Sequence, residues 1–178
     1  MGLHVALLRG INVGGKHKLP MKELCPMFEA AGCERVRSFI QSGNVVFDAS
    51  TAVAKGVPAR VGAAIEKRYG FETPIVLRTA KELRAAFENN PLLEPPIDPK
   101  LVYLGVMAKA PGQAALAKLE PDRFLPDVFV VRGRDIYLRY PNGVARSRLT
   151  NAYLDARLGT PTTMRNWNTV AKLVEMLS

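Results

Sequence analysis

The same order of predicted strands and helices occurs twice along the 178-residue chain. This repetition constrains the fold more than any other feature of the sequence. In the first series, four short apolar segments are predicted as strands: 3–8, 35–41, 44–48 and 74–78. Two helices are predicted between them, at 20–31 and at about 58–69. The resulting order, β-α-β-β-α-β, is that of a ferredoxin-like unit.

A linking helix at 80–88, which opens with the capping box Thr79-Ala80-Lys81-Glu82, and a proline-rich connector at 89–99 separate the two series. The second series repeats the order: strand 101–107, helix 112–119, strands 127–132 and 135–140, helix 148–158, a strand near 162–164 and a last helix at 167–177. We therefore predict an α+β fold of two ferredoxin-like halves packed together, at 1–79 and 101–178, joined by 80–100, with a C-terminal helix. The duplication rests on element order alone, because no residue-level repeat is evident.

The formal charge of +9 is spread evenly along the chain. Such a diffuse positive field attracts nucleic acid, nucleotides or acidic partners, although a basic protein with no polyanionic partner has the same composition. Cys25 and Cys33 are too few for a disulfide framework and are expected to be buried, inert thiols. No signal peptide or membrane-spanning run is evident, which favours the cytoplasm.

The stretch LLRGINVGGKHK (7–18) carries the strongest functional signal. A strand runs into a loop with three glycines and several cations, and a helix with no evident side-chain cap follows, with Leu19 at its N-cap position and Pro20 as its first residue. The ferredoxin-like strand order, 4-1-3-2, brings the end of the first strand beside the start of the third. We therefore expect two turns to converge in a cationic notch. Its candidate ligand-binding residues are Arg9, Asn12, Gly14, Gly15, Lys16, Lys18, Ser42 and Asn44.

The alternative is a plain strand–helix loop, in which the glycines serve geometry and the lysines are simply solvated. Neither a Walker sequence nor G-x-G-x-x-G is present. A second polar cluster, Arg165, Asn166 and Asn168, could add donors at another helix start. It could also be structural, with Asn166 as a cap and Trp167 as a core anchor.

Aromatic residues suited to stacking nucleic-acid bases are sparse in the first half. In the second half, Tyr103, Tyr137 and Arg139 could share an open sheet face as a stacking platform, unless that face is covered. No metal-ligand spacing, cofactor motif or catalytic signature is evident, and His17 is only a weak candidate base.

Three segments resemble one bacterial family, domain-of-unknown-function family number 1697: LLRGINVGG (7–15), SGNVVF (42–47) and RNWNTVAKL (165–173). The resemblance extends along nearly the whole chain. It implies two related, ferredoxin-like halves in a small cytosolic protein, and it implies no activity.

The residues favour a protein that binds a phosphate-bearing ligand, a nucleotide or nucleic acid, at 9–18 and 42–44. Two alternatives stay open. One is an enzyme that acts on a small phosphorylated or carboxylated metabolite at the same loops, and the other is an interaction module with no small ligand. The sequence gives neither the identity of the ligand nor the oligomeric state.

Overall fold

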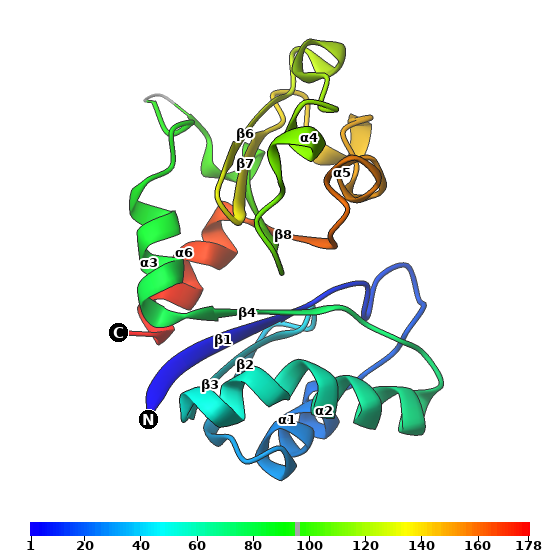
Figure 1. The fold of residues 1–178 in the computed structure, drawn as a ribbon, viewed down its shortest axis with the longest axis vertical. Coiled ribbons are helices and arrows are strands. Elements are labelled where there is room, and N and C mark those ends of the chain that lie inside the picture. The colour runs from blue at the N-terminus through cyan, green and yellow to red at the C-terminus, as the bar shows by residue number, and fades with distance from the viewer. Residues whose placement is uncertain (95–96) are drawn as a thin grey trace. The chain divides into compact units, whose positions relative to one another are not determined.

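The computed structural model describes residues 1–94 and 97–178, and its contacts divide the chain into two compact units. The first unit comprises Met1–Arg84 together with Leu173–Ser178, and the second comprises Ala85–Lys172. Each unit contains one four-stranded antiparallel sheet (Figure 1).

The first unit has the predicted ferredoxin-like topology. Its elements are β1 (Gly2–Leu8), α1 (Met21–Ala30), β2 (Glu34–Phe39), β3 (Asn44–Ala49), α2 (Thr51–Tyr69) and β4 (Ile75–Thr79). The strand order β2-β3-β1-β4 confirms the predicted order 4-1-3-2. Helices α1 and α2 cover one face of the sheet (Figure 1), and between them lies an apolar core that includes Leu8, Phe28, Phe47 and Val61.

The second unit repeats this topology, with strand order β6-β7-β5-β8. Its elements, counting the helix that enters it and the helix that leaves it, are α3 (Ala80–Glu88), η1 (Pro99–Leu101), β5 (Val102–Met107), α4 (Gln113–Leu116), η2 (Pro121–Phe124), β6 (Val128–Arg132), β7 (Asp135–Arg139), η3 (Val144–Arg146), α5 (Asn151–Leu158), β8 (Thr162–Asn166) and α6 (Trp167–Met176). The protein therefore has an α+β fold of two ferredoxin-like halves with a C-terminal helix.

The predicted start of the second helix is wrong. Helix α2 begins at Thr51 and not at Pro58, and the Ser50 hydroxyl caps it by accepting a hydrogen bond from the Val53 N–H at 3.2 Å. A proline inside a helix removes one backbone hydrogen bond and costs roughly 3 kcal/mol. The helix nevertheless continues through Pro58, because it buries a full apolar stripe: Ala54, Val57, Val61 and Ile65.

Strand register also corrects the predicted stacking platform. Tyr103 pairs with Leu138, whereas Tyr137 pairs with Leu104, so the two tyrosines lie on opposite faces of the sheet. Tyr103 instead packs edge-on against Tyr140, with ring centroids 5.4 Å apart. A one-residue difference in register moves a side chain to the other face, and the sequence pattern of these apolar strands does not fix it.

The last strands of the two units carry an equivalent arginine. Arg78 lies opposite Val5 in the β1–β4 pair, and Arg165 lies opposite Leu104 in the β5–β8 pair. Each guanidinium donates to the carbonyl of the preceding residue, at 3.0 Å in β4 and 2.9 Å in β8. Each strand then runs directly into a helix. The two halves therefore share this arginine contact as well as their strand order, and reading the sequence by element order does not reveal it.

The turn between β2 and β3, residues 40–43, packs tightly on the end of β1. The Leu8 N–H donates to the Gly43 carbonyl at 2.8 Å. A Cβ atom added to Gly43 would lie 2.7 Å from the Leu8 Cβ and 2.8 Å from the Ile11 Cδ1, and the φ angle of Gly43 is +82°. Only glycine fits this position without strain.

We predict that Gly43→Ala lowers the free energy of unfolding by roughly 2–4 kcal/mol, because it adds a steric clash to an unfavourable φ angle. The matched control is Gly14→Ala, where φ is +59° but nothing lies within 4 Å of the added Cβ. It should cost only about 1 kcal/mol. Urea unfolding of both variants measures the difference, and equal losses would contradict the close approach at Gly43.

Candidate functional site

Residues 12–17 form a small hairpin at the end of β1. Gly14 and Gly15 have φ angles of 59° and 74°, as a type I′ turn requires. The turn is closed by the Lys16 N–H, which donates to the Val13 carbonyl at 3.1 Å. Every residue from 13 to 18 is exposed, and Val13 retains 64% of its accessible surface. We call residues 13–18 the cationic loop, because it carries Lys16, His17 and Lys18.

Asn12 fixes the base of the cationic loop through all of its side-chain polar groups. Its Nδ2 donates to the carbonyls of Leu19 at 2.8 Å and Gln41 at 2.7 Å. Its Oδ1 accepts from the Leu19 N–H at 2.8 Å. One asparagine therefore holds the loop both to the start of α1 and to the 40–43 turn. In this conformation no polar atom of its side chain is left over for a ligand.

The two turns meet as predicted, but the expected notch between them is filled. Ile11 is 1% exposed and lies against Gly43. Asn44 is 0% exposed, and its Nδ2 donates to the Phe39 carbonyl and to the Ser42 Oγ, both at 3.0 Å. An apolar residue within the polar loop therefore closes the space, and the polar side chains at 42 and 44 stabilise the turn.

The charged groups of the cationic loop point to solvent. Lys16 and Lys18 are exposed, and within residues 1–94 and 97–178 neither side chain has a hydrogen-bond or ion-pair partner. Arg9, before the loop, is partly exposed. Its carbonyl accepts from the Thr73 hydroxyl at 2.6 Å, which ties this end of β1 to the segment before β4.

His17 has a fixed orientation despite its exposure. Its ring stacks on Phe71, with centroids 4.4 Å apart and planes 16° from parallel. Its Nδ1 lies 3.0 Å from the Gly10 carbonyl, which can only accept, so Nδ1 carries the proton. The residue adopts a φ angle of 50°, an uncommon conformation that costs on the order of 1 kcal/mol outside glycine. Such strain is concentrated at functional sites.

The start of α1 does not add to an anion site. Pro20 is the N-cap, one residue later than predicted, and no side chain caps the helix. Glu23 lies in the first turn, where it pairs with Arg68 at 2.6 Å and accepts a hydrogen bond from the Tyr69 hydroxyl. The negative charge of the Glu23 carboxylate therefore offsets the positive electrostatic potential at the N-terminus of α1.

The polar cluster at 165–168 belongs to the second unit and has the structural role weighed from the sequence. The Asn166 Oδ1 accepts from the Asn168 N–H at 3.0 Å, and Trp167 stacks on Phe87 at 4.9 Å between centroids. Arg165 is only 9% exposed. Burial lowers the pKa of its guanidinium to about 10, so it stays protonated at neutral pH.

Three further observations concern the part of the chain that the structure describes. No group of three His, Cys, Asp or Glu side chains that could hold a metal ion occurs there. Burial raises the pKa of the Cys33 thiol to about 11, which makes it a poor nucleophile at neutral pH. Over the same residues, no helix combines the length and the apolar character that crossing a bilayer requires.

We predict that Asn12→Gly destabilises the protein by roughly 1–3 kcal/mol, because it leaves the buried Leu19 backbone without its side-chain partners. Glycine tolerates the φ angle of 54° at this position, so the loss reports the hydrogen bonds. Asn12→Ala should lose about 1 kcal/mol more, from the φ angle. Chemical denaturation provides the measurement, and a neutral Asn12→Gly variant would refute the role of Asn12.

Comparison with known proteins identifies the family of the chain but gives no activity for it. No curated protein matches the chain. The conserved bacterial protein SP0830 from Streptococcus pneumoniae is similar in structure, with a TM-score of 0.69 and 24% sequence identity over 99% of each chain. At that identity the likeness shows the fold alone. A model of the family described as "Protein of unknown function (DUF1697)" matches residues 1–137. Because that match spans most of its length, this chain belongs to the DUF1697 family.

Proposed function

We propose that the cationic loop binds the phosphate backbone of a single-stranded nucleic acid. The observation that carries this proposal is a pair of unpaired lysines that directly precede and follow His17 in the sequence, while the His17 ring is stacked on Phe71. Positive charge beside a stacked aromatic ring is the combination that proteins use to hold single strands, with phosphates on the cations and bases on the rings.

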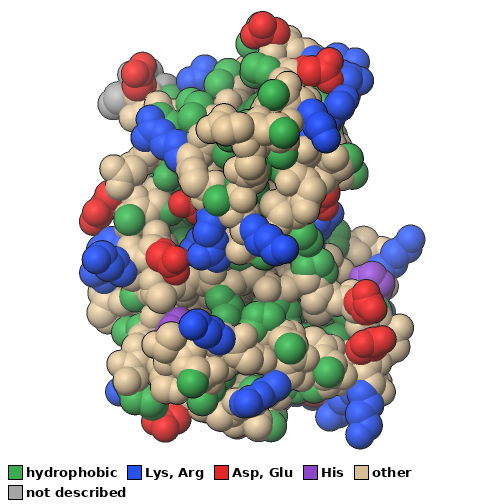
Figure 2. All heavy atoms as spheres, viewed as in Figure 1, with side chains coloured by type: hydrophobic (Ala, Val, Ile, Leu, Met, Phe, Trp, Pro, Cys, Tyr) green, Lys and Arg blue, Asp and Glu red, His purple; other side chains and the backbone are tan. Residues whose placement is uncertain are grey.

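The exposure of the loop favours an extended ligand over a small one. Lys16 and Lys18 are hydrated, so a single small anion gains little from them. A polyanion contacts several cations at once and releases its condensed counterions, which strengthens binding. The positive charge elsewhere assists approach, since Lys and Arg side chains are scattered over the face in Figure 2.

The rigidity of the loop supports the same proposal. Gly14 and Gly15 are both exposed, and backbone N–H groups commonly contact phosphates. Asn12 fixes the base of the loop, and Ser42 and Asn44 fix the adjoining turn. In this proposal these three polar side chains position the loop, and Arg9 contributes charge at its entrance.

The residues 165, 166 and 168 play no part in this proposal. Two of them are engaged as a buried cation and a helix cap. The exposed Asn168 amide is uncharged, and it lies in the second unit.

We expect Lys16→Ala/Lys18→Ala to lower the salt dependence of oligonucleotide binding. For single strands, each phosphate neutralised contributes about 0.7 to the slope of log affinity against log salt concentration, so the slope should fall by roughly 1.4. Fluorescence anisotropy of a labelled oligothymidylate, titrated at several salt concentrations, gives this slope.

The matched control is Lys55→Ala/Lys67→Ala, which removes the same charge from exposed positions of α2. Its slope should stay close to that of the wild type. Equal slopes for the two double variants would show that only net charge matters, and absence of binding by the wild type would end the proposal in favour of an interaction module.

His17→Ala tests the stacking half of the proposal separately. The substitution removes the ring and neither lysine charge, so affinity should fall by about 1–3 kcal/mol while the salt slope stays close to that of the wild type. The same anisotropy titration decides it. An affinity equal to that of the wild type would show that no base stacks at this position.

A further inference from the structure

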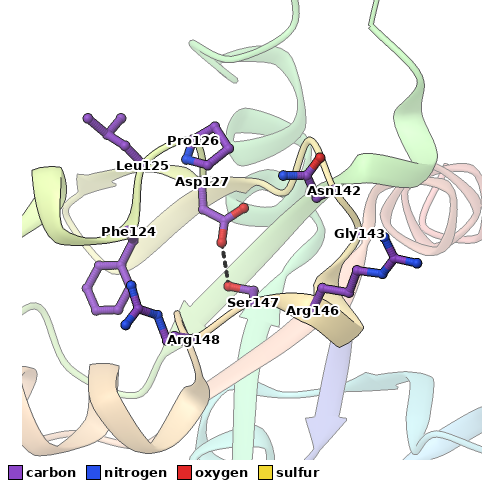
Figure 3. A pocket seen from close by; sticks show the side chains of 9 residues that line it. All are labelled: Phe124, Leu125, Pro126, Asp127, Asn142, Gly143, Arg146, Ser147 and Arg148. Carbon is purple, nitrogen blue, oxygen red and sulfur yellow. Dashed lines mark hydrogen bonds between the residues drawn. The ribbon is translucent and has the colours of Figure 1, made fainter.

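A cavity of about 430 Å³ lies within the second unit, remote in sequence from the cationic loop. Two segments form its wall: residues 124–127, which lead into β6, and residues 142–148, between β7 and α5 (Figure 3). The first segment is anchored by Phe124, whose ring packs edge-on against Tyr153 with centroids 4.6 Å apart. The volume falls within the range of small-molecule sites in proteins.

A largely buried carboxylate lines this cavity. Asp127 is 8% exposed, and its Oδ2 accepts a hydrogen bond from the Ser147 hydroxyl at 2.6 Å. The Ser147 Oγ in turn accepts from the Leu149 N–H at 2.9 Å, which directs the hydroxyl proton to the carboxylate. Among the described residues, no Lys or Arg forms an ion pair with Asp127.

A carboxylate has about four acceptor positions, and buried charges in proteins are normally paired or fully hydrogen-bonded. The Ser147 hydroxyl fills one of these positions on Asp127. Because Asp127 lines the cavity, its other acceptor positions are available to hydrogen-bond donors that enter it.

Two arginines without ion-pair partners among the described residues line the same cavity. Arg146 and Arg148 are both exposed, and neither guanidinium has a hydrogen-bond or ion-pair partner among the residues that the structure describes. In Figure 3 their side chains lie on opposite sides of the Asp127–Ser147 pair. Guanidinium groups bind phosphate in a bidentate manner, and two of them match the charge of about −2 on a phosphate monoester.

We infer that this cavity binds a phosphorylated polyol, a small molecule in which a phosphate monoester is joined to neighbouring hydroxyl groups. The phosphate contacts Arg146 and Arg148, and the hydroxyls donate to the Asp127 carboxylate. Sugar phosphates and nucleoside monophosphates share this chemistry. Leu125, with Pro126 beside it, offers an apolar wall that suits the base of a nucleoside, and Leu125 is 65% exposed.

The test is calorimetric titration of the full chain with four probes at constant ionic strength: ribose 5-phosphate, adenosine monophosphate, ribose and inorganic phosphate. Both phosphorylated polyols should bind at least about tenfold more tightly than inorganic phosphate, because only they satisfy Asp127. Tighter binding of adenosine monophosphate identifies a nucleotide site, and equal binding identifies a sugar phosphate site.

Variants test which residues bind the phosphate of the ligand and which bind its hydroxyl groups. Arg146→Ala/Arg148→Ala should weaken both phosphorylated polyols by about tenfold or more. Asp127→Asn should weaken them while leaving inorganic phosphate unaffected. The arginine variant changes only exposed residues, so it should fold even if Asp127→Asn does not, and circular dichroism checks each. The matched control is Lys109→Ala/Lys118→Ala, which removes the same charge from exposed positions of this unit.

Three results would overturn the inference: no binding of either phosphorylated polyol, inorganic phosphate binding as tightly as ribose 5-phosphate, or equal effects of the arginine variant and its lysine control. Lys16→Ala/Lys18→Ala should leave these affinities unchanged. The proposals for the cavity and for the cationic loop can therefore be refuted independently.

Discussion

The hydrogen bonds of the Asn12 amide are the interactions on which the candidate site depends. A polar loop between a strand and a helix has backbone groups that need partners, and the backbone hydrogen bonds of the hairpin satisfy only some of them. Asn12 supplies the remainder by bonding both the N–H and the carbonyl of Leu19 and the carbonyl of Gln41. That attachment holds the base of the loop that presents Lys16, His17 and Lys18.

The two ferredoxin-like halves share a scaffold and differ in the chemistry of their loops. Arg78 and Arg165 occupy equivalent register positions and make the same contact to the preceding carbonyl. The loops differ: the first unit presents an exposed cationic hairpin, and the second lines a cavity that includes a buried carboxylate. Loops on a rigid scaffold commonly carry function, and they change while the core is retained.

Element order and strand order could be predicted from the sequence, because short apolar segments and a single topology determine them. The meeting of the first loop with the 40–43 turn follows from that topology. The filling of the expected notch does not, because Ile11 is an isolated apolar residue among polar ones and only its burial reveals its role. Strand register at Tyr137 and the continuation of α2 through Pro58 depend on tertiary packing, which overrides local pattern.

The site proposed in the second unit could not be predicted from the sequence either. Asp127 and Ser147 are separated by twenty residues, and neither belongs to a motif.

For the cationic loop, the most direct measurement is the mapping of amide chemical shifts in the ¹⁵N-labelled protein as an oligothymidylate is added. The account predicts that the largest changes occur at Gly14, Gly15, Lys16 and His17. Changes confined to residues outside 9–18 and 71–73 would contradict it.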